Sequence, residues 1–270
     1  MSEEAEVTIS YLILCHDSPD RIVRLVTRIL SDDETGQVVI HFDKNSSRAK
    51  FNELKTRLYD ASRCHIVEQR VKCGWGQWSL VEATFLLICE ALNNKTTHYY
   101  LVSENCYPVK PIESLKKFLY NHKNNDFIEC EDASWVTDGV SEGRYQYLYF
   151  FNKKKYPRLH RWGYKMQSRL LKKRKTPKGL AIRFGSQWWC LTNRTLNKIV
   201  DSHYAYRGFF VYTWIPDEMY IQSLIWKLSR KTVISKTLTY YNFDECGHPE
   251  SVDKLKTYPE SVFFARKFIN

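Results

Sequence analysis

The sequence predicts an α/β protein with a mostly parallel central sheet and helices on both of its faces. Short apolar runs rich in β-branched residues alternate with amphipathic helical segments, which is typical of parallel sheets. A hydrophobic content of 43% indicates a folded globular chain. At 270 residues we expect one large domain over 1–270, with its two halves meeting near residue 130.

The first half of the chain carries the clearer pattern. Ser79 is expected to cap the second helix, with Glu82 completing a capping box. The second half is less regular and more aromatic. Taken in order, the predicted elements are a strand at 7–14, a helix from Asp20, strands at 37–42 and 64–67, a helix at 79–92, a strand at 99–103, a helix at 112–121, strands at 126–130 and 186–191, and helices at 193–202 and 217–228.

Polar residues follow several of these strands directly. His16 comes after the first strand, Asp43 after the second, and the segment 103–107 after the strand that ends there. In open α/β sheets, ligands bind beyond the carboxyl ends of the strands. We therefore expect a ligand site at this edge.

The eight cysteines are scattered without a C-x-x-C pair, so zinc and redox motifs are absent. Several lie in apolar runs, as reduced cysteines do in a core. The first residues lack the pattern of a secretory signal, and no apolar stretch approaches the ~20 residues of a membrane-spanning helix. These features predict a cytoplasmic protein that is not inserted in a membrane.

The net charge of +11 is concentrated at 152–178, a segment without Asp or Glu. A solvated loop and helix face would explain it. An anionic partner, such as an acidic lipid headgroup, a phosphate-bearing acceptor or nucleic acid, is the other interpretation. Tyr156, Trp162 and Tyr164 interleave the charges, which suits a membrane interface as well as a nucleic-acid groove.

Motifs for common cofactors and metals are missing. No G-x-G-x-x-G or Walker A loop occurs, and there is no D-x-D triplet to hold a divalent ion. We interpret Glu129, Glu131 and Asp132 as surface acids. No cofactor and no metal are expected.

The sequence VFFARKFIN near the end of the chain places Arg266 and Lys267 between phenylalanines. A packed strand with snorkelling cations is one interpretation. The other is that these cations neutralise a departing diphosphate, which needs such groups when no metal is bound.

The sequence WIPDEMYIQSLI contains a second candidate. Pro216, Asp217 and Glu218 fit the first turn of a helix. A carboxylate at the mouth of the sheet could equally act as a general base.

These residues resemble the core-2/I-branching β-1,6-N-acetylglucosaminyltransferases and the related peptide O-xylosyltransferases. The resemblance follows the chain in order over nearly its whole length, which makes seven individually weak strings specific. They are the strand ending at His16, VIHFDKNS at 39–46, GWGQWSLVEATFLLICEAL at 74–92, YYLVSENCYPVKP at 99–111, FGSQWWCLTN at 184–193, PDEMYIQSLI at 216–225, and GHPESV with FFARKF at the end.

The resemblance implies a GT-A-like fold and an inverting, metal-independent transfer from a UDP-sugar, with GlcNAc or xylose as the sugar. It implies that Glu218 is the catalytic base and that Lys267, with Arg266 beside it, binds the diphosphate. Lys236 is a guess for a further phosphate-binding cation.

The resemblance also divides the chain into a nucleotide-binding half, 1–130, and an acceptor and catalytic half, 131–270. His16 and Asp43 are similar to uridine-side contacts, and Trp75 and Gly76 match a string near the nucleotide. The residues implied for the sugar and acceptor are Ser186, Gln187, Trp188 and Asp217.

Two departures from the family pattern affect the expected function. The usual S-G-x-D-Y-P string reads SENCYP here, with Cys106 in place of Asp. The disulfides and membrane anchor of the animal enzymes are absent, which implies a bacterial member making surface polysaccharide. The acceptor would then be a glycan or lipid-linked glycan, with segment 153–178 contacting the inner face of the membrane and no nucleic acid bound. The alternative function is a non-catalytic protein that binds nucleic acid or membrane through that segment.

Overall fold

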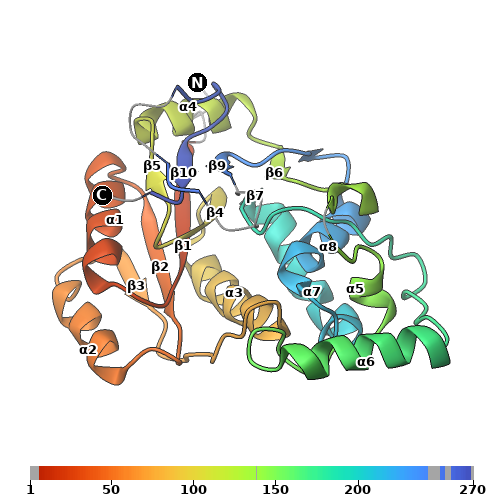
Figure 1. Cartoon of the computed structure of the whole chain (residues 1–270). Helices are drawn as coiled ribbons and strands as arrows, with labels where there is room; N and C mark the ends of the chain where they lie inside the picture. Colours follow the sequence, from red (N-terminus) through yellow and green to blue (C-terminus); the bar gives the residue numbers. More distant parts are fainter. Residues whose placement is uncertain (1–5, 138, 243–249, 253–256, 269–270) are drawn as a thin grey trace.

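A seven-stranded sheet forms the centre of the structure, in the order β3-β2-β1-β4-β7-β6-β8 (Figure 1). The computed structural model describes residues 6–137, 139–242, 250–252 and 257–268. Within this sheet β7 runs antiparallel to β4 and β6, while the other paired strands are parallel. The strands are β1 (Ile9–Cys15), β2 (Gln37–Phe42), β3 (Cys64–Ile66), β4 (His98–Ser103), β6 (Asp126–Ile128), β7 (Trp189–Thr192) and β8 (Val233–Ile234).

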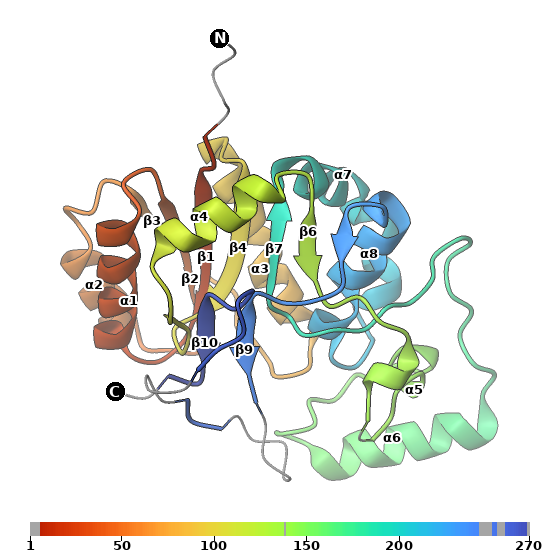
Figure 2. The ribbon, with the colours of Figure 1, turned by 90° about the horizontal axis from the view of Figure 1, so that it is seen from above.

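A second sheet of three short strands joins distant parts of the chain. It contains β5 (Tyr107–Pro108), β10 (Phe264–Arg266) and β9 (Thr239–Tyr241), in that order. Figure 2 shows this small sheet, together with α5 and α6, on the side of the molecule where β1, β4 and β6 end. The carboxyl edge of the central sheet is therefore covered by the second half of the chain.

Helices cover both faces of the central sheet. One face packs against α1 (Pro19–Asp32), α2 (Arg48–Arg57) and α4 (Ile112–Asn121), and the other against α3 (Trp78–Ala91), α7 (Asn193–Phe210) and α8 (Tyr220–Ser229). Two more helices, α5 (Gly143–Gln146) and α6 (Pro157–Leu170), lie outside these layers. The single-turn 3₁₀ helices are η1 (Leu92–Asn94), η2 (Ala133–Trp135) and η3 (Pro216–Glu218).

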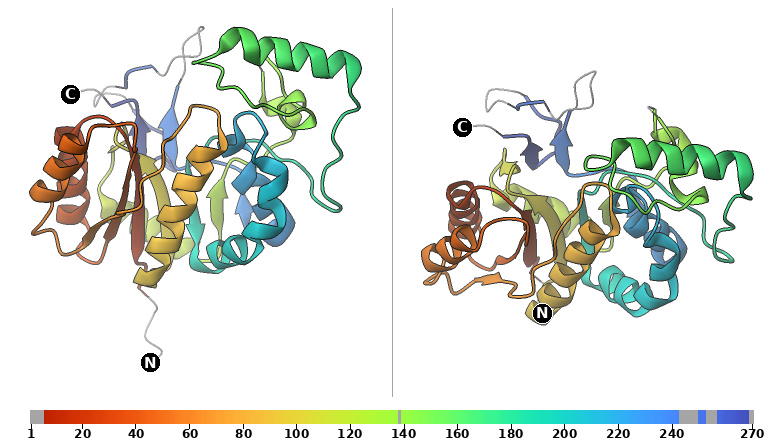
Figure 3. Two further views of the ribbon diagram at one scale, coloured as in Figure 1. Left: turned by 90° about the horizontal axis from the view of Figure 1, so that it is seen from below. Right: turned by 60° about the horizontal axis from the view of Figure 1, so that its bottom comes forward.

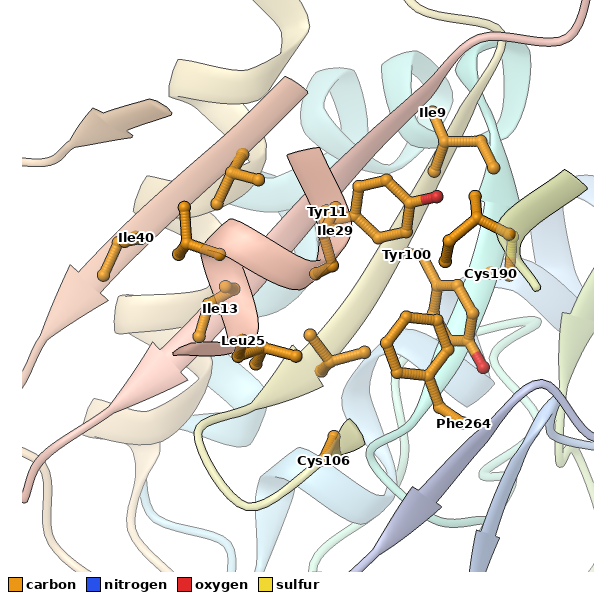
Figure 4. Packing of buried hydrophobic residues seen from close by; sticks show 14 of the residues in the cluster. Ile9, Tyr11, Ile13, Leu25, Ile29, Ile40, Tyr100, Cys106, Cys190 and Phe264 are labelled. Atoms are coloured by element: carbon orange, nitrogen blue, oxygen red, sulfur yellow. The ribbon is translucent and has the colours of Figure 1, made fainter. Parts of the chain in front are cut away.

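Successive side chains of β1 point to opposite faces of the sheet and so belong to two separate hydrophobic cores. Tyr11 and Ile13 belong to the cluster beneath α1, whereas Leu12 belongs to the cluster beneath α3. Figure 4 shows the first cluster, where Tyr11 and Tyr100 lie with Phe264 of β10. Each large apolar side chain contributes roughly 1.5–3 kcal/mol when fully buried. The packing of Phe264 in this core anchors the strand that carries Arg266.

The predicted α/β architecture with a mostly parallel sheet is confirmed, and the interpretation of a packed strand near Arg266 is confirmed by β10. The predicted cap is wrong. The helix begins at Trp78, and the Ser79 hydroxyl instead accepts a hydrogen bond of 2.8 Å from the amide of Gly74. Cys246 and residues 247–249 of the GHPESV string lie outside the described residues.

Three predicted boundaries also differ in the second half. The helix expected at 193–202 continues to Phe210. The strand expected at 186–191 begins at Trp189. The side-chain amide of Gln222 donates a hydrogen bond of 2.9 Å to the Ser186 carbonyl, which is therefore not paired with a neighbouring strand. The helix expected at 217–228 is divided into η3 and α8. Ile215 adopts a left-handed conformation with φ of 55°, which turns the chain sharply before Pro216.

Candidate active site

Loops after β1 and β4 meet at the carboxyl edge of the sheet. Glu104 is buried, and its carboxylate accepts hydrogen bonds from the backbone amides of His16 and Asp17, at 3.2 and 3.0 Å. The Nδ1 atom of His16 lies 2.9 Å from the same carboxylate, which raises the pKa of His16. Burial alone would raise the pKa of Glu104, but the hydrogen bonds from His16 and Asp17 lower it. This carboxylate holds the loop that carries His16.

Asp43 lies beside this loop, at the end of β2. Its Oδ1 accepts hydrogen bonds from the amides of Asn45 and Cys73, at 2.7 and 3.2 Å. The guanidinium of Arg70 donates to the carbonyls of Asp43 and Ser46, at 2.7 and 2.8 Å. The buried Asp43 carboxylate is thus fixed by backbone donors, and its Oδ2 receives no hydrogen bond from the described residues.

Glu218 ends the 3₁₀ turn η3, whose position depends on the loop before α3. The amide of Ile215 donates to the carbonyl of Gly76 at 3.0 Å. Gly76 has a φ of 66°, a conformation that favours glycine. Arg144 of α5 then donates a hydrogen bond of 2.7 Å from Nη1 to Oε2 of Glu218. A carboxylate is therefore presented at the edge of the sheet with one cationic partner.

Burial raises the pKa of both carboxyl groups in this turn. For Glu218, the opposing charge of Arg144 offsets part of that effect. For Asp217, the charge of Glu218 adds to it, and Oδ1 is buried without a hydrogen-bond partner among the described residues. A carboxylate with a raised pKa accepts a proton more readily than one in water, which suits a general base.

The stretch from Gly185 to Trp188 lies against this turn. The amide of Gly185 donates to the Glu218 carbonyl at 3.1 Å, and the amide of Ser186 donates to the Glu129 carboxylate at 2.8 Å. A Cβ at Gly185 would lie 2.1 Å from the Glu129 carbonyl oxygen, so only glycine fits. The close backbone contacts of Gly185 with Glu218 and Glu129 fix the position of the stretch 185–188 relative to Glu218.

Arg266 lies at the other end of this stretch. Its Cζ is 5.0 Å from the centre of the Trp188 ring. The Nε atom is buried without a hydrogen-bond partner, and no carboxylate in the described part of the chain forms an ion pair with this guanidinium. The amide of Phe268 donates to the Asn105 carbonyl at 2.9 Å, which places this end of the chain beside the β4 loop. Lys267, the next residue, is half-buried.

A cleft of about 320 Å³ opens beside the Glu218 turn. The rings of Trp75 and Trp214 line it with an edge-on geometry, 6.5 Å between centroids, and Tyr149 packs against Trp214. The Lys153 ammonium lies 4.8 Å from the centre of the Trp214 ring. Arg144 contacts the same tryptophan, so this aromatic cleft adjoins the carboxylate of Glu218.

The structure brings most of the predicted residues to this edge. His16 and Asp43 lie at the ends of β1 and β2, and the second group surrounds Glu218. Lys236 is exposed, and the described contacts give it no partner in the site. The second group consists of Trp75, Gly76, Ser186, Gln187, Trp188 and Asp217, which lie in the Glu218 turn or in the segments bonded to it, and of Arg266, which lies over the ring of Trp188, with Lys267 following in sequence.

Sequence reasoning missed the roles of four residues at the site. The interpretation of Glu129 as a surface acid is wrong, because it accepts hydrogen bonds from the Ser186 amide and the Tyr241 hydroxyl, whereas Glu131 and Asp132 are exposed as predicted. Glu129 follows the strand β6 directly, a signal that applies equally to Glu104 after β4. No signal in the sequence pairs Arg144 with Glu218. The missed residues are Glu104, Glu129, Arg144 and Tyr241.

The described ranges contain neither a cluster of metal ligands nor a helix that could span a membrane. Within those ranges, no three His, Cys, Asp or Glu side chains come together as a metal site would require. The helices in the same ranges are too short or too polar to cross a bilayer. The seven cysteines in the described part of the chain are free thiols.

A half-buried carboxylate beside an aromatic cleft, at the carboxyl edge of a mostly parallel sheet, is an arrangement typical of α/β enzymes. The sequence model described as "Branch: Core-2/I-Branching enzyme" matches residues 9–263. The chain therefore belongs to the core-2/I-branching enzyme family. The description of this family names an enzyme, which favours a catalytic protein over the alternative of a non-catalytic binding protein.

Known relatives are distant in sequence. Xylosyltransferase 2 of Rattus norvegicus is 23% identical over 298 residues, covering 97% of this chain and 32% of the relative. Xylosyltransferase 2 of Homo sapiens is 24% identical over 299 residues, with 97% and 32% covered. The chain thus spans about a third of the length of these relatives.

Two solved structures are among those with some similarity to this chain. S. aureus TarS, residues 1–349, has a TM-score of 0.45 and 11% identity, covering 86% of this chain and 61% of that one. The galactosyltransferase LgtC, in complex with donor and acceptor sugar analogs, has a TM-score of 0.42 and 8% identity, with 83% and 72% covered.

Proposed function

We propose that the protein transfers GlcNAc or xylose from a UDP-sugar to a hydroxyl of an acceptor glycan, with inversion and without a metal ion. Glu218 takes the proton of the acceptor hydroxyl as its oxygen attacks the anomeric carbon. The bond from that carbon to the diphosphate breaks, and Arg266 and Lys267 stabilise the charge that leaves with UDP. The acceptor hydroxyl is thereby converted to a glycosidic oxygen.

One observation carries this proposal: a carboxylate and a cation lie at the two ends of one short stretch. The amide of Gly185 holds the backbone of Glu218, and the ring of Trp188 holds the guanidinium of Arg266. Single displacement with inversion needs the base and the leaving group on opposite faces of the sugar. A sugar lying along Ser186 and Gln187 would have Glu218 on one side and Arg266 on the other.

The nucleotide is proposed to bind where β1 and β2 end. The Oδ2 atom of Asp43 is fixed in place and has no hydrogen-bond donor in the described structure, so it can accept one from a ribose hydroxyl or the uracil N–H. His16 lies beside it, held by Glu104. In this proposal the base and ribose would lie near β1 and the diphosphate toward β10.

The acceptor is proposed to enter through the aromatic cleft. Trp75, Trp214 and Tyr149 offer flat apolar surfaces of the kind on which sugar rings pack, and the cleft adjoins the carboxylate that must reach the acceptor hydroxyl. We further propose a bacterial surface polysaccharide or a lipid-linked glycan as the acceptor class.

Calorimetry with a panel of donors tests the proposal. UDP-GlcNAc, UDP-xylose, UDP-glucose and UDP-galactose are titrated with and without EDTA, and the donor that binds is used for transfer to a set of glycans. We expect one of the first two to bind regardless of EDTA, and proton NMR to show an inverted anomeric centre in the product. Retention of configuration, or activity lost in EDTA and restored by Mn²⁺, would contradict the mechanism.

A further inference from the structure

Helix α6, green in Figure 3, runs along the outside of the molecule, away from the central sheet. It exposes large apolar side chains. Trp162 is 60% exposed and Leu170 is 76% exposed, values that are high for residues of this size. Its inner side is fixed: Gln167 is buried and exchanges two hydrogen bonds with the backbone of Leu148, at 2.7 and 3.0 Å. The apolar side chains therefore face outward as a consequence of how the helix docks.

These exposed residues form two parallel rows. Residues at spacing i, i+3, i+7 and i+11 share one side of a helix. The apolar row has that spacing, and the basic row has the same spacing one residue earlier, so the two lie side by side. The apolar row is Leu159, Trp162, Met166 and Leu170, and the basic row is Arg158, Arg161, Lys165 and Arg169.

The stretch of sequence that contains the helix carries charge of one sign only. Residues 143–200 contain no Asp or Glu, and 153–178 contain twelve Lys and Arg. Of these, Arg174 is used within the fold, donating to the Phe209 carbonyl at 2.7 Å. Nucleic acid would account for the basic row but not for an outward row of Leu, Met and Trp. An apolar groove on a partner protein would account for the apolar row but not for a basic row without acidic residues between its cations.

We propose that α6 lies flat in the headgroup region of an anionic lipid bilayer. The apolar row enters the acyl boundary, and the basic row contacts lipid phosphates. Trp162 lies in the apolar row, and tryptophan favours this interface.

The position of α6 links this contact to the active site. The chain leads from the cleft residue Lys153 directly into α6, and both lie at the carboxyl edge of the sheet. A membrane-bound α6 would hold the aromatic cleft close to the bilayer surface, where a lipid-linked acceptor presents its glycan. This last step rests on the proposed function; the membrane contact itself does not.

Sedimentation with vesicles tests the contact. The intact protein is mixed with vesicles of phosphatidylcholine alone or containing phosphatidylglycerol. We expect binding only to the anionic vesicles, and on the order of tenfold weaker binding when the apolar row is replaced by L159S/W162S/M166S/L170S. The matched control is Y59S/Y204S, which removes two exposed aromatic residues (86% and 85%) outside α6 and should leave binding unchanged.

The depth and the specificity of binding are measured separately. Brominated lipids should quench the tryptophan fluorescence of the wild type, and W162F should lose most of that quenching. Calorimetry with UDP-sugar and transfer to a soluble glycan show whether a variant is folded and active, so failure of the contact is distinguishable from failure of the proposed function. Equal binding by the apolar-row variant, or displacement of vesicles by RNA at matched charge, would overturn the proposal.

Discussion

The guanidinium of Arg144 holds the carboxylate of Glu218 at 2.7 Å, although 74 positions separate the two residues in the chain. Arg144 is itself fixed on α5: its Nε donates to the Val140 carbonyl at 2.9 Å, and its own carbonyl accepts from the Trp214 amide at 2.9 Å. The proposed base is therefore oriented by a buried cation that also contacts the wall of the cleft. A cation so placed favours the ionised carboxylate and opposes the effect of burial on its pKa.

Replacing Arg144 with Met should raise the pKa of Glu218 further, since burial would act without an opposing charge. A base must be ionised to accept a proton, so the acid limb of the kcat/KM profile should move to higher pH. Initial rates across pH 4.5 to 9 measure this limb. Arg144→Lys keeps a positive charge and should shift the limb less. An acid limb unchanged in Arg144→Met would show that the ion pair does not control the base.

Glu218→Gln should lower kcat by about 10² to 10⁴, the usual contribution of a positioned general base, because the amide cannot take the acceptor's proton. Affinity for UDP, measured by calorimetry, should stay near that of the wild type. Glu131→Gln, at an exposed carboxylate beyond β6, is the matched control and should retain full turnover. A Glu218→Gln variant with nearly normal turnover would remove Glu218 from the mechanism.

Asp217 should make the folded state less stable as pH rises. Its folded-state pKa is raised by burial and by the charge of Glu218, so folding favours the protonated form. The stability that this group contributes is fully present below the ordinary aspartate pKa and is lost as pH rises through the raised value.

Asp217→Asn stays neutral at every pH and avoids that loss. The melting temperature of the variant, relative to wild type, should therefore be higher at pH 8 than at pH 5. Thermal melts across this range measure the difference, and Asp201→Asn, at an exposed position on α7, should show no such trend. A difference that is flat with pH would mean that Asp217 titrates normally.

The first half of the fold could be predicted because its pattern is local. The strands 37–42 and 99–103 are continuous apolar runs, and the helix 112–121 has both its predicted bounds. The second sheet could not be predicted, since its strands have two or three residues and pair only through tertiary contacts. Phe264 pairs with Thr239 on one side and with Pro108 on the other, which no window of the sequence brings together.

The site divides in the same way. His16, Asp43 and Glu218 were predictable because each follows a strand or begins a helix in a recognisable string. The partners of these residues come near them only in the folded structure. Glu104 follows another strand and contacts His16, and Arg144 lies on a helix outside the sheet layers and contacts Glu218. The sequence pattern thus indicated the candidate functional groups but not the groups that orient them.

Arg266 offers the sharpest test of how the leaving diphosphate is stabilised, because the chain contains a close structural match for it. Arg266 lies 5.0 Å from the ring of Trp188, and Arg183 lies 3.8 Å from the ring of Trp226, on the side of α8. Both have a buried Nε without a hydrogen-bond partner among the described residues. Truncating either one removes a cation from a tryptophan, so both should cost similar stability.

Of these two arginines, only Arg266 has a proposed role toward the donor. Arg266→Ala should lower kcat/KM for the UDP-sugar by about 10² to 10³, as removal of a group that meets developing negative charge does, and Arg266→Lys should recover part of the loss. Arg183→Ala should keep the wild-type kcat/KM while its melting temperature falls. Equal kinetic losses in the two alanine variants would mean that Arg266 contributes only packing. The kinetics of Lys267→Ala would then show whether Lys267 alone stabilises the charge of the leaving diphosphate.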